Sequence, residues 1–281
     1  MTSIYQTKLC NSPTYLTLTW SKNLYSHSLT IYAADSFSIT LSLYPSTFSF
    51  FRNRPGFKSI YLTHHHYQRI KLYWDFTRAE FSQNLADPHS SFYIAVSSNG
   101  KLEFFLGDLQ DELIRRSGLI ISRQFAEPVL LSRRELVFGR KSHISRVHFL
   151  GTKHEIGIEY SGGILKVKVD GETSVVVKRL AWKFRKHERI HVDGIEVDLF
   201  WDGFNWVNSN NGCVNNGNSN ESNGGNGHGF FIFQVGGAGV WLEMVDPEKR
   251  LMKKSLSLLG SSSMASAGSL SQSPSCSSVL Q

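Results

Sequence analysis

Alternation of apolar and polar residues is the dominant pattern along the chain, and it predicts β-strands. In residues 37–43, four apolar side chains alternate with three hydroxyl-bearing ones, as expected for a strand with one buried and one solvated face. The same period of two recurs at residues 29–33, 70–74, 92–96, 102–106, 156–160, 165–169 and 197–201. The pattern predicts an all-β fold.

Turn motifs separate several of these segments. They are Ser98-Asn99-Gly100, Ser161-Gly162-Gly163, Asp170-Gly171 and Asp193-Gly194. Asn-Gly and Asp-Gly pairs readily adopt the positive φ angles that tight hairpins require. We therefore expect a meander of antiparallel strands.

Residues 108–116 predict a single short helix. Acidic residues open the segment and Arg115 and Arg116 close it, which suits the helix dipole, and Gly118 follows as a cap. Leu109 and Leu113 form one apolar stripe that is sufficient for docking on a sheet. Because the segment lies near the middle of the ordered chain, we expect it to connect two halves.

The sequences on the two sides of this helix are similar. Residues 71–76 are matched by 198–203, 48–52 by 181–185, 91–94 by 229–232 and 102–103 by 242–243. The matches occur in the same order, at offsets of about 127 to 140 residues. This order predicts an internal duplication of a β unit.

Together these patterns predict two related antiparallel units, sandwich-like or barrel-like, packed as one body. The units are placed at residues 4–107 and 133–246, with a helical connector at 108–132. Residues 205–229 are rich in Asn and Gly and predict a flexible loop, and 247–281 predict a disordered Ser-rich tail. A single continuous sandwich is the alternative.

Composition favours a globular intracellular protein, cytoplasmic or nuclear, with peripheral membrane association left open. Hydrophobic residues make up 41% of the chain and aromatic residues 12%. Cys10, Cys213 and Cys276 have no paired spacing, which favours a reducing compartment. The N-terminal residues lack the apolar run of a secretory signal, and we expect no transmembrane segment.

No motif for catalysis, cofactor binding or metal binding is present, so we predict a non-enzyme whose interior is filled by rings and branched aliphatic side chains. His64-His65-His66 predicts a solvated loop, since adjacent strand residues point to opposite faces and at most two of these imidazoles share one. Trp74-Asp75 and Trp201-Asp202 form a matched pair. As twin ligand sites they would expose aromatic platforms, but we favour buried tryptophans followed by turn-capping aspartates.

Basic residues are concentrated in one region of the chain. Residues 113–203 carry 17 basic and 11 acidic side chains. The candidate residues for binding an anionic partner are Lys166, Lys168, Lys178, Arg179, Lys183, Arg185, Lys186 and Arg189, interleaved with Trp182 and Phe184. Arg133, Arg134, Arg140, Lys141 and Arg146 precede them. A sheet face neutralised by nearby glutamates is the alternative interpretation.

The region suggests an anionic membrane or protein partner, reached through basic side chains. A nucleic acid is less favoured, since no recognised nucleic-acid fold signature is present. Ser255 and Ser257 follow a basic cluster and are candidate phosphorylation sites, at which added charge would weaken anionic contacts.

A string of motifs in a fixed order resembles a known family. The motifs lie at residues 5–7, 18–24, 27–30, 74–76, 92–96, 106–108, 137–141, 182–185, 192–194 and 200–202. On these residues, nearly the whole chain up to about Val245 resembles a plant family known as domain of unknown function 868. The resemblance implies a plant origin and a shared fold, and it implies no catalytic residues.

For function, the sequence favours a non-enzymatic interaction scaffold. The alternative is a binder of a small apolar or amphipathic ligand inside a β-cup, and an unrecognised enzyme ranks third. The pattern identifies neither the partner nor the oligomeric state.

Overall fold

The computed structural model describes residues 1–23, 26–34, 36–43, 54–62, 68–82, 85–123, 125–138, 142–149, 151–208 and 227–236. In these residues the chain forms eighteen strands and two helices, which confirms the all-β prediction. The strands of the first half are β1 (Thr2–Leu9), β2 (Ser12–Lys22), β3 (His27–Ala33), β4 (Phe37–Leu43), β5 (Gly56–Tyr61), β6 (Arg69–Asp75), β7 (Glu80–Phe81), β8 (Pro88–Ser90), β9 (Tyr93–Ser98) and β10 (Lys101–Gly107). Those of the second half are β11 (Val129–Phe138), β12 (Ser142–Phe149), β13 (Thr152–Ser161), β14 (Ile164–Val169), β15 (Glu172–Val177), β16 (Arg185–Val192), β17 (Ile195–Asp202) and β18 (His228–Val235).

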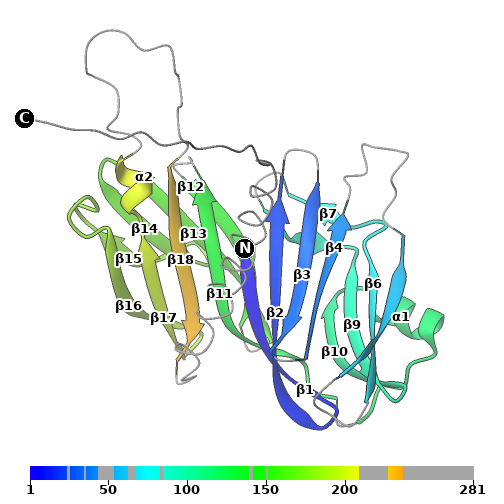
Figure 1. Ribbon diagram of the computed structural model, residues 1–281. Coiled ribbons are helices and arrows are strands. Elements are labelled where there is room, and N and C mark those ends of the chain that lie inside the picture. The colour runs from blue at the N-terminus through cyan, green and yellow to red at the C-terminus, as the bar shows by residue number, and fades with distance from the viewer. Residues whose placement is uncertain are drawn as a thin grey trace, which may run out of the picture. The chain divides into compact units, whose positions relative to one another are not determined.

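One long sheet runs through both halves of the described chain (Figure 1). Its strand order is β16-β17-β18-β11-β1-β2-β3-β4, and every neighbouring pair is antiparallel. Two four-stranded sheets, β10-β9-β6-β5 and β12-β13-β14-β15, complete the fold together with the small β7-β8 ribbon. The pairing of β1 with β11 joins the first half to the second.

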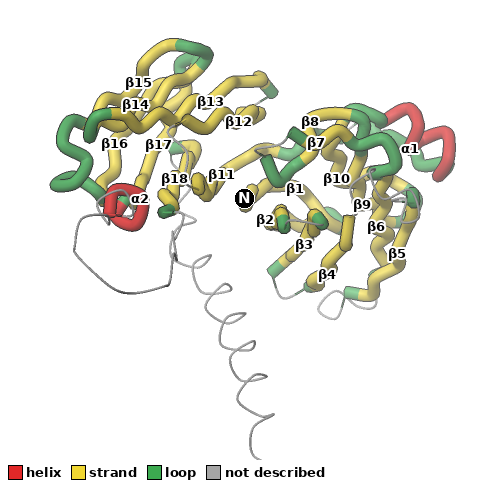
Figure 2. Tube along the Cα trace, turned by 90° about the horizontal axis from the view of Figure 1, so that it is seen from above, coloured by secondary structure: helices red, strands yellow, loops and turns green. Residues whose placement is uncertain are grey.

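Each four-stranded sheet faces one half of the long sheet, which gives two lobes of two layers each (Figure 2). In the N-terminal lobe, formed by β1 to β10, the rings of Tyr5 on β1 and Phe104 on β10 meet at 5.8 Å. In the C-terminal lobe, formed by β11 to β18, the ring of Tyr160 on β13 contacts Trp206, which in turn contacts Phe231 on β18. Alternation therefore buries one face of every sheet against the facing layer.

The two lobes share a strand order. In each lobe a meander of four strands, β1–β4 or β12–β15, precedes strands of the facing sheet. The strand β6 lies between β5 and β9, and β17 lies between β16 and β18, so the matched Trp-Asp motifs occupy equivalent strands. In the N-terminal lobe β10 lies beside β9 and follows the β1–β4 meander in the chain. In the C-terminal lobe the corresponding place beside β18 is occupied by β11, which precedes the β12–β15 meander. The topology fits an internal duplication, and the duplication itself stays a prediction.

The predicted helix and turns are confirmed. Helix α1 (Gln110–Ser117) ends at Gly118, which adopts φ 66° and donates its N–H to the Ile114 carbonyl. Leu113 packs against Tyr93, Ala95 and Leu102, so the helix covers the outer face of the β9–β10 hairpin. The turn residues form the pairs Asn99 and Gly100, Asp170 and Gly171, and Asp193 and Gly194, all with positive φ.

The predicted loop at 205–229 is shorter than the sequence suggested. Helix α2 (Phe204–Asn208) occupies its start, and β18 begins at His228. Trp206 on α2 is 2% exposed, because its ring packs on Phe231 of β18. Residues 209–226 and the tail at 247–281 lie outside the described residues.

Candidate functional site: the loop between β15 and β16

The eight basic candidates are distributed over two sheets and the loop that joins them. Lys166 and Lys168 lie on β14 of a four-stranded sheet, opposite the buried Leu165, Val167 and Val169. Arg185, Lys186 and Arg189 lie on β16 at the edge of the long sheet, and Lys178, Arg179 and Lys183 lie between β15 and β16. They do not share one strand face.

The candidates on the strands are largely neutralised by carboxylates. Lys168 Nζ lies 2.7 Å from a Glu159 oxygen, Arg185 Nη2 lies 2.6 Å from an Asp202 oxygen, Lys186 Nζ lies 3.2 Å from a Glu188 oxygen, and Arg189 Nε lies 3.0 Å from an Asp198 oxygen. Such exposed pairs contribute little stability, but they offset the positive charge that a partner would meet. The alternative interpretation of a neutralised sheet face thus holds for β16 and for Lys168 on β14, whereas the exposed Lys166 has no ion pair among the described residues.

The loop between the two strands is different. We call residues 178–184 the Trp182 loop. Lys178, Arg179 and Lys183 are exposed, and within the described part of the chain none of the three forms an ion pair. Trp182 stands among them with 84% of its surface exposed. Of the tryptophans that the structure describes, this is the exposed one; Trp20, Trp201 and Trp206 are buried and Trp74 is partly buried.

The backbone of the Trp182 loop is held at both ends. The N–H of Leu180, a fully buried residue, donates to the Gly163 carbonyl at 2.9 Å. The Lys183 carbonyl accepts a hydrogen bond of 3.0 Å from the indole of the buried Trp201. At the end of the loop, the Phe184 carbonyl accepts a hydrogen bond of 2.7 Å from the Gly203 N–H. A fixed backbone therefore presents Trp182 to solvent while Leu180 points into the lobe.

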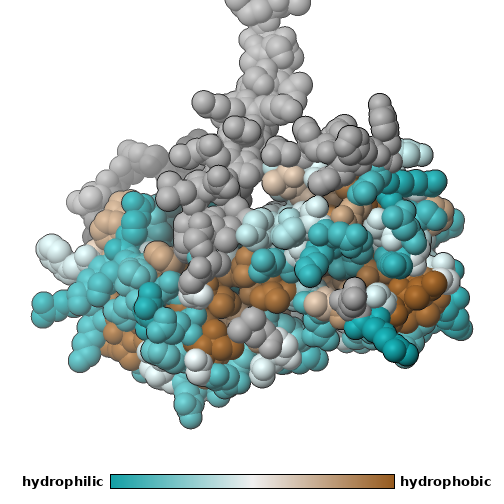
Figure 3. Space-filling view, turned by 90° about the horizontal axis from the view of Figure 1, so that it is seen from below, coloured by the Kyte–Doolittle hydropathy of each residue, from teal (hydrophilic) through white to brown (hydrophobic). Residues whose placement is uncertain are grey.

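A second exposed ring lies beside this loop. Phe204, the first residue of α2, is 47% exposed and meets Phe184 edge to face at 5.1 Å between ring centroids. Single exposed apolar residues are ordinary on protein surfaces. In the view from below, hydrophobic residues lie at several separate places among hydrophilic ones (Figure 3). What distinguishes the Trp182 loop is the combination of an exposed indole with three cations that have no carboxylate partner in the part of the chain that the structure describes.

The interior departs from the sequence prediction most clearly around β11, where several ionisable side chains are buried together. Arg133 and Glu135 on β11 are 4% and 2% exposed, and Arg133 Nε lies 2.5 Å from Glu135 Oε1. Arg133 Nη2 donates to Ser145 Oγ on β12 at 2.9 Å and to Asp87 Oδ2, before β8, at 3.1 Å. Ser145 Oγ in turn donates to Glu135. The expectation of a purely apolar interior is wrong here, and Arg133 does not belong to a basic surface.

The charges in this cluster compensate one another. Burial opposes ionisation of Glu135, but the Arg133 guanidinium together with the contacts of His143 and Ser145 outweighs it and holds the pKa of the Glu135 carboxyl well below its ordinary value. Burial also opposes the charge on Arg133, and the carboxylates of Glu135 and Asp87 reverse this and raise the pKa of the guanidinium. Burial raises the pKa of the neighbouring Tyr5 phenol to about 12. The cluster therefore links β11 to β12 and to the segment before β8 as a paired ionic network.

The matched Trp-Asp motifs have structural roles in both lobes. Asp75 accepts the Thr77 N–H at 2.8 Å, and its other oxygen lies 3.0 Å from Arg116 of α1. Asp202 likewise accepts the Phe204 N–H at 3.2 Å and pairs with Arg185. Both aspartates thus close the turn after their strand, as the favoured interpretation predicted, but of the two tryptophans Trp201 is buried and Trp74 is only partly buried.

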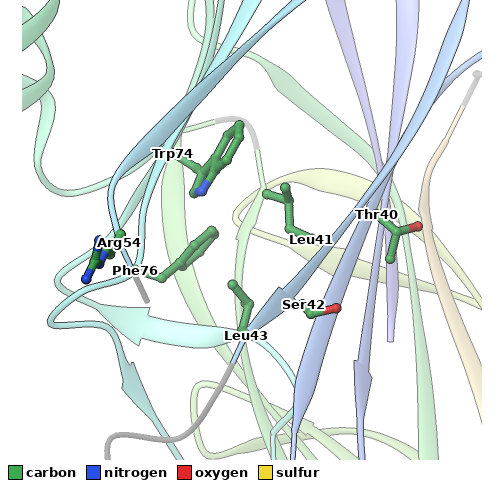
Figure 4. Close-up of a pocket in the computed structure, with 7 residues that line it drawn as sticks. All are labelled: Thr40, Leu41, Ser42, Leu43, Arg54, Trp74 and Phe76. Atoms are coloured by element: carbon green, nitrogen blue, oxygen red, sulfur yellow. The ribbon is translucent and has the colours of Figure 1, made fainter. Parts of the chain in front are cut away.

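A small pocket lies at the seam between β4 and β6 (Figure 4). Its volume is about 200 Å³, and it is lined by Thr40, Leu41, Ser42, Leu43, Arg54, Trp74 and Phe76. Leu41 and Leu43 face Trp74 and Phe76 across it. Pockets that enclose drug-sized ligands usually measure roughly 300 to 1,000 Å³. This pocket lies between the edge strand β4 of the long sheet and β6 of the facing sheet, and it does not form the β-cup that a ligand binder would use.

Several sequence candidates lie outside the described residues. These are His64, His65, His66, Arg140, Lys141, Cys213, Ser255, Ser257 and Cys276. Among the residues that are described, His, Cys, Asp and Glu form no group of three or more suited to a metal ion. Neither helix in the described part of the chain has the length or the apolar run needed to cross a bilayer.

Comparison with known protein families matches residues 1–280 to a family described as plant protein of unknown function (DUF868). The chain belongs to this family. The match confirms the resemblance that the ordered motifs indicated, and it extends past the part of the chain that carries those motifs. Searches of curated proteins and of solved structures found no match to the chain. Membership of DUF868 assigns no activity, so a function has to be argued from the geometry of the Trp182 loop.

Proposed function

We propose that the protein is a non-enzymatic interaction scaffold that docks on an anionic partner, a membrane or a protein, through the Trp182 loop. The observation that supports this most is the exposure of Trp182 at 84% between three cations that have no carboxylate partner among the described residues. Binding of a partner to the Trp182 loop would cost little backbone entropy, because the hydrogen bonds of Leu180 and Lys183 already fix the loop backbone. The cations supply long-range attraction to negative charge.

The rest of the described fold supports a scaffold. The two lobes bury aromatic and branched aliphatic side chains between their sheets, and the buried ions around Arg133 pair with one another. The alternative of a small-ligand binder has less support, since the pocket at Trp74, at about 200 Å³, is smaller than the pockets that usually enclose drug-sized ligands.

Charge reversal tests the proposal. We expect K178E/R179E/K183E to lower affinity for the anionic partner roughly hundredfold or more, since each basic residue near an anionic surface contributes about 1 kcal/mol. A matched control, K8E/K58E/K101E, changes the net charge equally at exposed lysines of the N-terminal lobe. The measurement is the fraction of tagged full-length chain that sediments with membranes or large assemblies in plant extracts.

Wild type and the control are expected to sediment with a partner, and the loop variant is expected to remain as free chain. Raising the salt concentration should release wild type, because exposed charges are screened over about 10 Å at 0.1 M salt. If the loop variant distributes like wild type, with unchanged thermal unfolding, the Trp182 loop is not the docking surface.

A further inference from the structure

We propose that the partner of the Trp182 loop is an anionic phospholipid bilayer, and that the Trp182 indole lies in the headgroup region when the protein is bound. This inference rests on the proposed function. It narrows the partner to a lipid surface, whereas the proposed function allows either a membrane or a protein.

The shape of the Trp182 loop favours a bilayer over a protein surface. Trp182 projects from a turn in which its own N–H donates to the Arg179 carbonyl and Leu180 is buried, so the Trp182 residue is 84% exposed. Specific protein interfaces cover about 800 Å² on each partner with closely packed surfaces, and their central aromatic residues fill matching pockets. A fluid bilayer accepts a single projecting ring without a shaped counterpart.

The chemistry of the Trp182 side chain also suits a membrane interface. An indole has a large apolar body and one N–H donor, and tryptophan is enriched at membrane–water interfaces for this reason. The other tryptophans in the described residues are wholly or partly buried, so exposure of this one is not a general property of the fold. Phe204 beside Phe184 adds a second ring close to the same loop.

The placement of the positive charges also fits lipid headgroups. Lys178, Arg179 and Lys183 lie within five residues of Trp182 on a single loop, whereas Lys168, Arg185, Lys186 and Arg189 are paired with carboxylates on the strands. A nucleic-acid strand would need cations along an extended track. A compact group of three cations around one ring matches lipid headgroups, whose charges are distributed laterally and can rearrange.

Vesicle flotation with the full-length chain tests the inference. Vesicles contain phosphatidylcholine alone or phosphatidylcholine with about one third phosphatidylserine, the anionic lipid of cytoplasmic leaflets. We expect wild type to float with the anionic vesicles and not with the neutral ones. W182A is expected to reduce the bound fraction about tenfold. The matched control is F57A, which removes a ring that is 64% exposed on β5, and it should float like wild type.

The outcomes separate the lipid inference from the proposed function. If wild type fails to float, but K178E/R179E/K183E still lowers the fraction of chain that sediments in extracts, the bilayer inference is wrong and an acidic protein is the partner. If neither experiment shows an effect, both are wrong. If W182A floats as well as wild type, the indole does not enter the headgroup region. Because Trp182 is exposed, thermal unfolding of W182A should match wild type, so weaker flotation reports on docking.

Discussion

Replacing Glu135 with glutamine is expected to lower the free energy of unfolding by about 3 to 5 kcal/mol, the range found when one partner of a buried ion pair is removed. Glu135 is 2% exposed and balances Arg133, which is also buried. Glutamine keeps the size of the side chain but leaves the guanidinium with Asp87 alone as a carboxylate partner. Urea unfolding of wild type and variant measures the difference.

Two companion variants sharpen this result. E172Q changes an exposed glutamate on β15 and should stay within about 0.5 kcal/mol of wild type. Replacing Arg133 with methionine together with Glu135 with leucine should recover much of the loss, because apolar residues of similar volume often substitute for buried ion pairs. If E135Q loses less than about 1 kcal/mol of unfolding free energy, the buried Arg133 guanidinium does not depend on Glu135 for a compensating charge.

The buried carboxylate of Glu135 also predicts that the unfolding free energy depends on pH. The pKa of Glu135 is held below its ordinary value of 4.5 in the folded chain, so folding retains an ionised carboxylate that the unfolded chain protonates below that pH. Its contribution to stability is therefore complete above about pH 4.5 and declines as the pH falls further. The fall in unfolding free energy below this pH should be less steep in E135Q.

Replacing Trp201 with alanine is expected to cost about 3 to 5 kcal/mol of unfolding free energy, the usual range for removing a large buried aromatic side chain. Trp201 is 2% exposed, and its indole N–H donates to the Lys183 carbonyl. Trp74 is the residue at the matching position of the other lobe, but it is only partly buried beside the pocket at Leu41. W74A should therefore cost clearly less than W201A in the same urea titration.

W201F separates packing from the hydrogen bond. The phenyl ring retains most of the apolar contact, so this variant should lose less stability than W201A, while the Lys183 carbonyl loses its donor. Faster proteolytic cleavage within the Trp182 loop is expected as a consequence. Equal stability of W74A and W201A would contradict the difference in burial between the two lobes.

Much of the local structure was predictable from the sequence because it depends on neighbouring residues. Alternation placed residues 37–43 on β4, and Asp193-Gly194 gave the turn between β16 and β17. The pairing of β1 with β11 was not predictable in this way. These strands are more than a hundred residues apart in the chain, and no local pattern encodes which edges meet.

The candidate site was predictable in composition but not in geometry. The sequence identified Trp182 and the surrounding cations. It could not show that Trp182 is exposed while Trp201 is buried, because each tryptophan is followed by a charged residue in a region that predicts strands. The buried network was missed because Ser132-Arg133-Arg134-Glu135 is typical of a solvated strand. Burial of Arg133 and Glu135 is decided by Ser145 and Asp87, which come from other segments.

Tryptophan fluorescence in the presence of brominated lipids is the most direct test of docking by the Trp182 loop. Bromine atoms in the acyl chains of anionic vesicles quench an indole that lies at the bilayer interface and leave the buried tryptophans emissive. Wild type should be quenched, and W182F should lose most of that quenching. Equal quenching of wild type and W182F, or no quenching of either, would contradict insertion of Trp182 into an anionic bilayer.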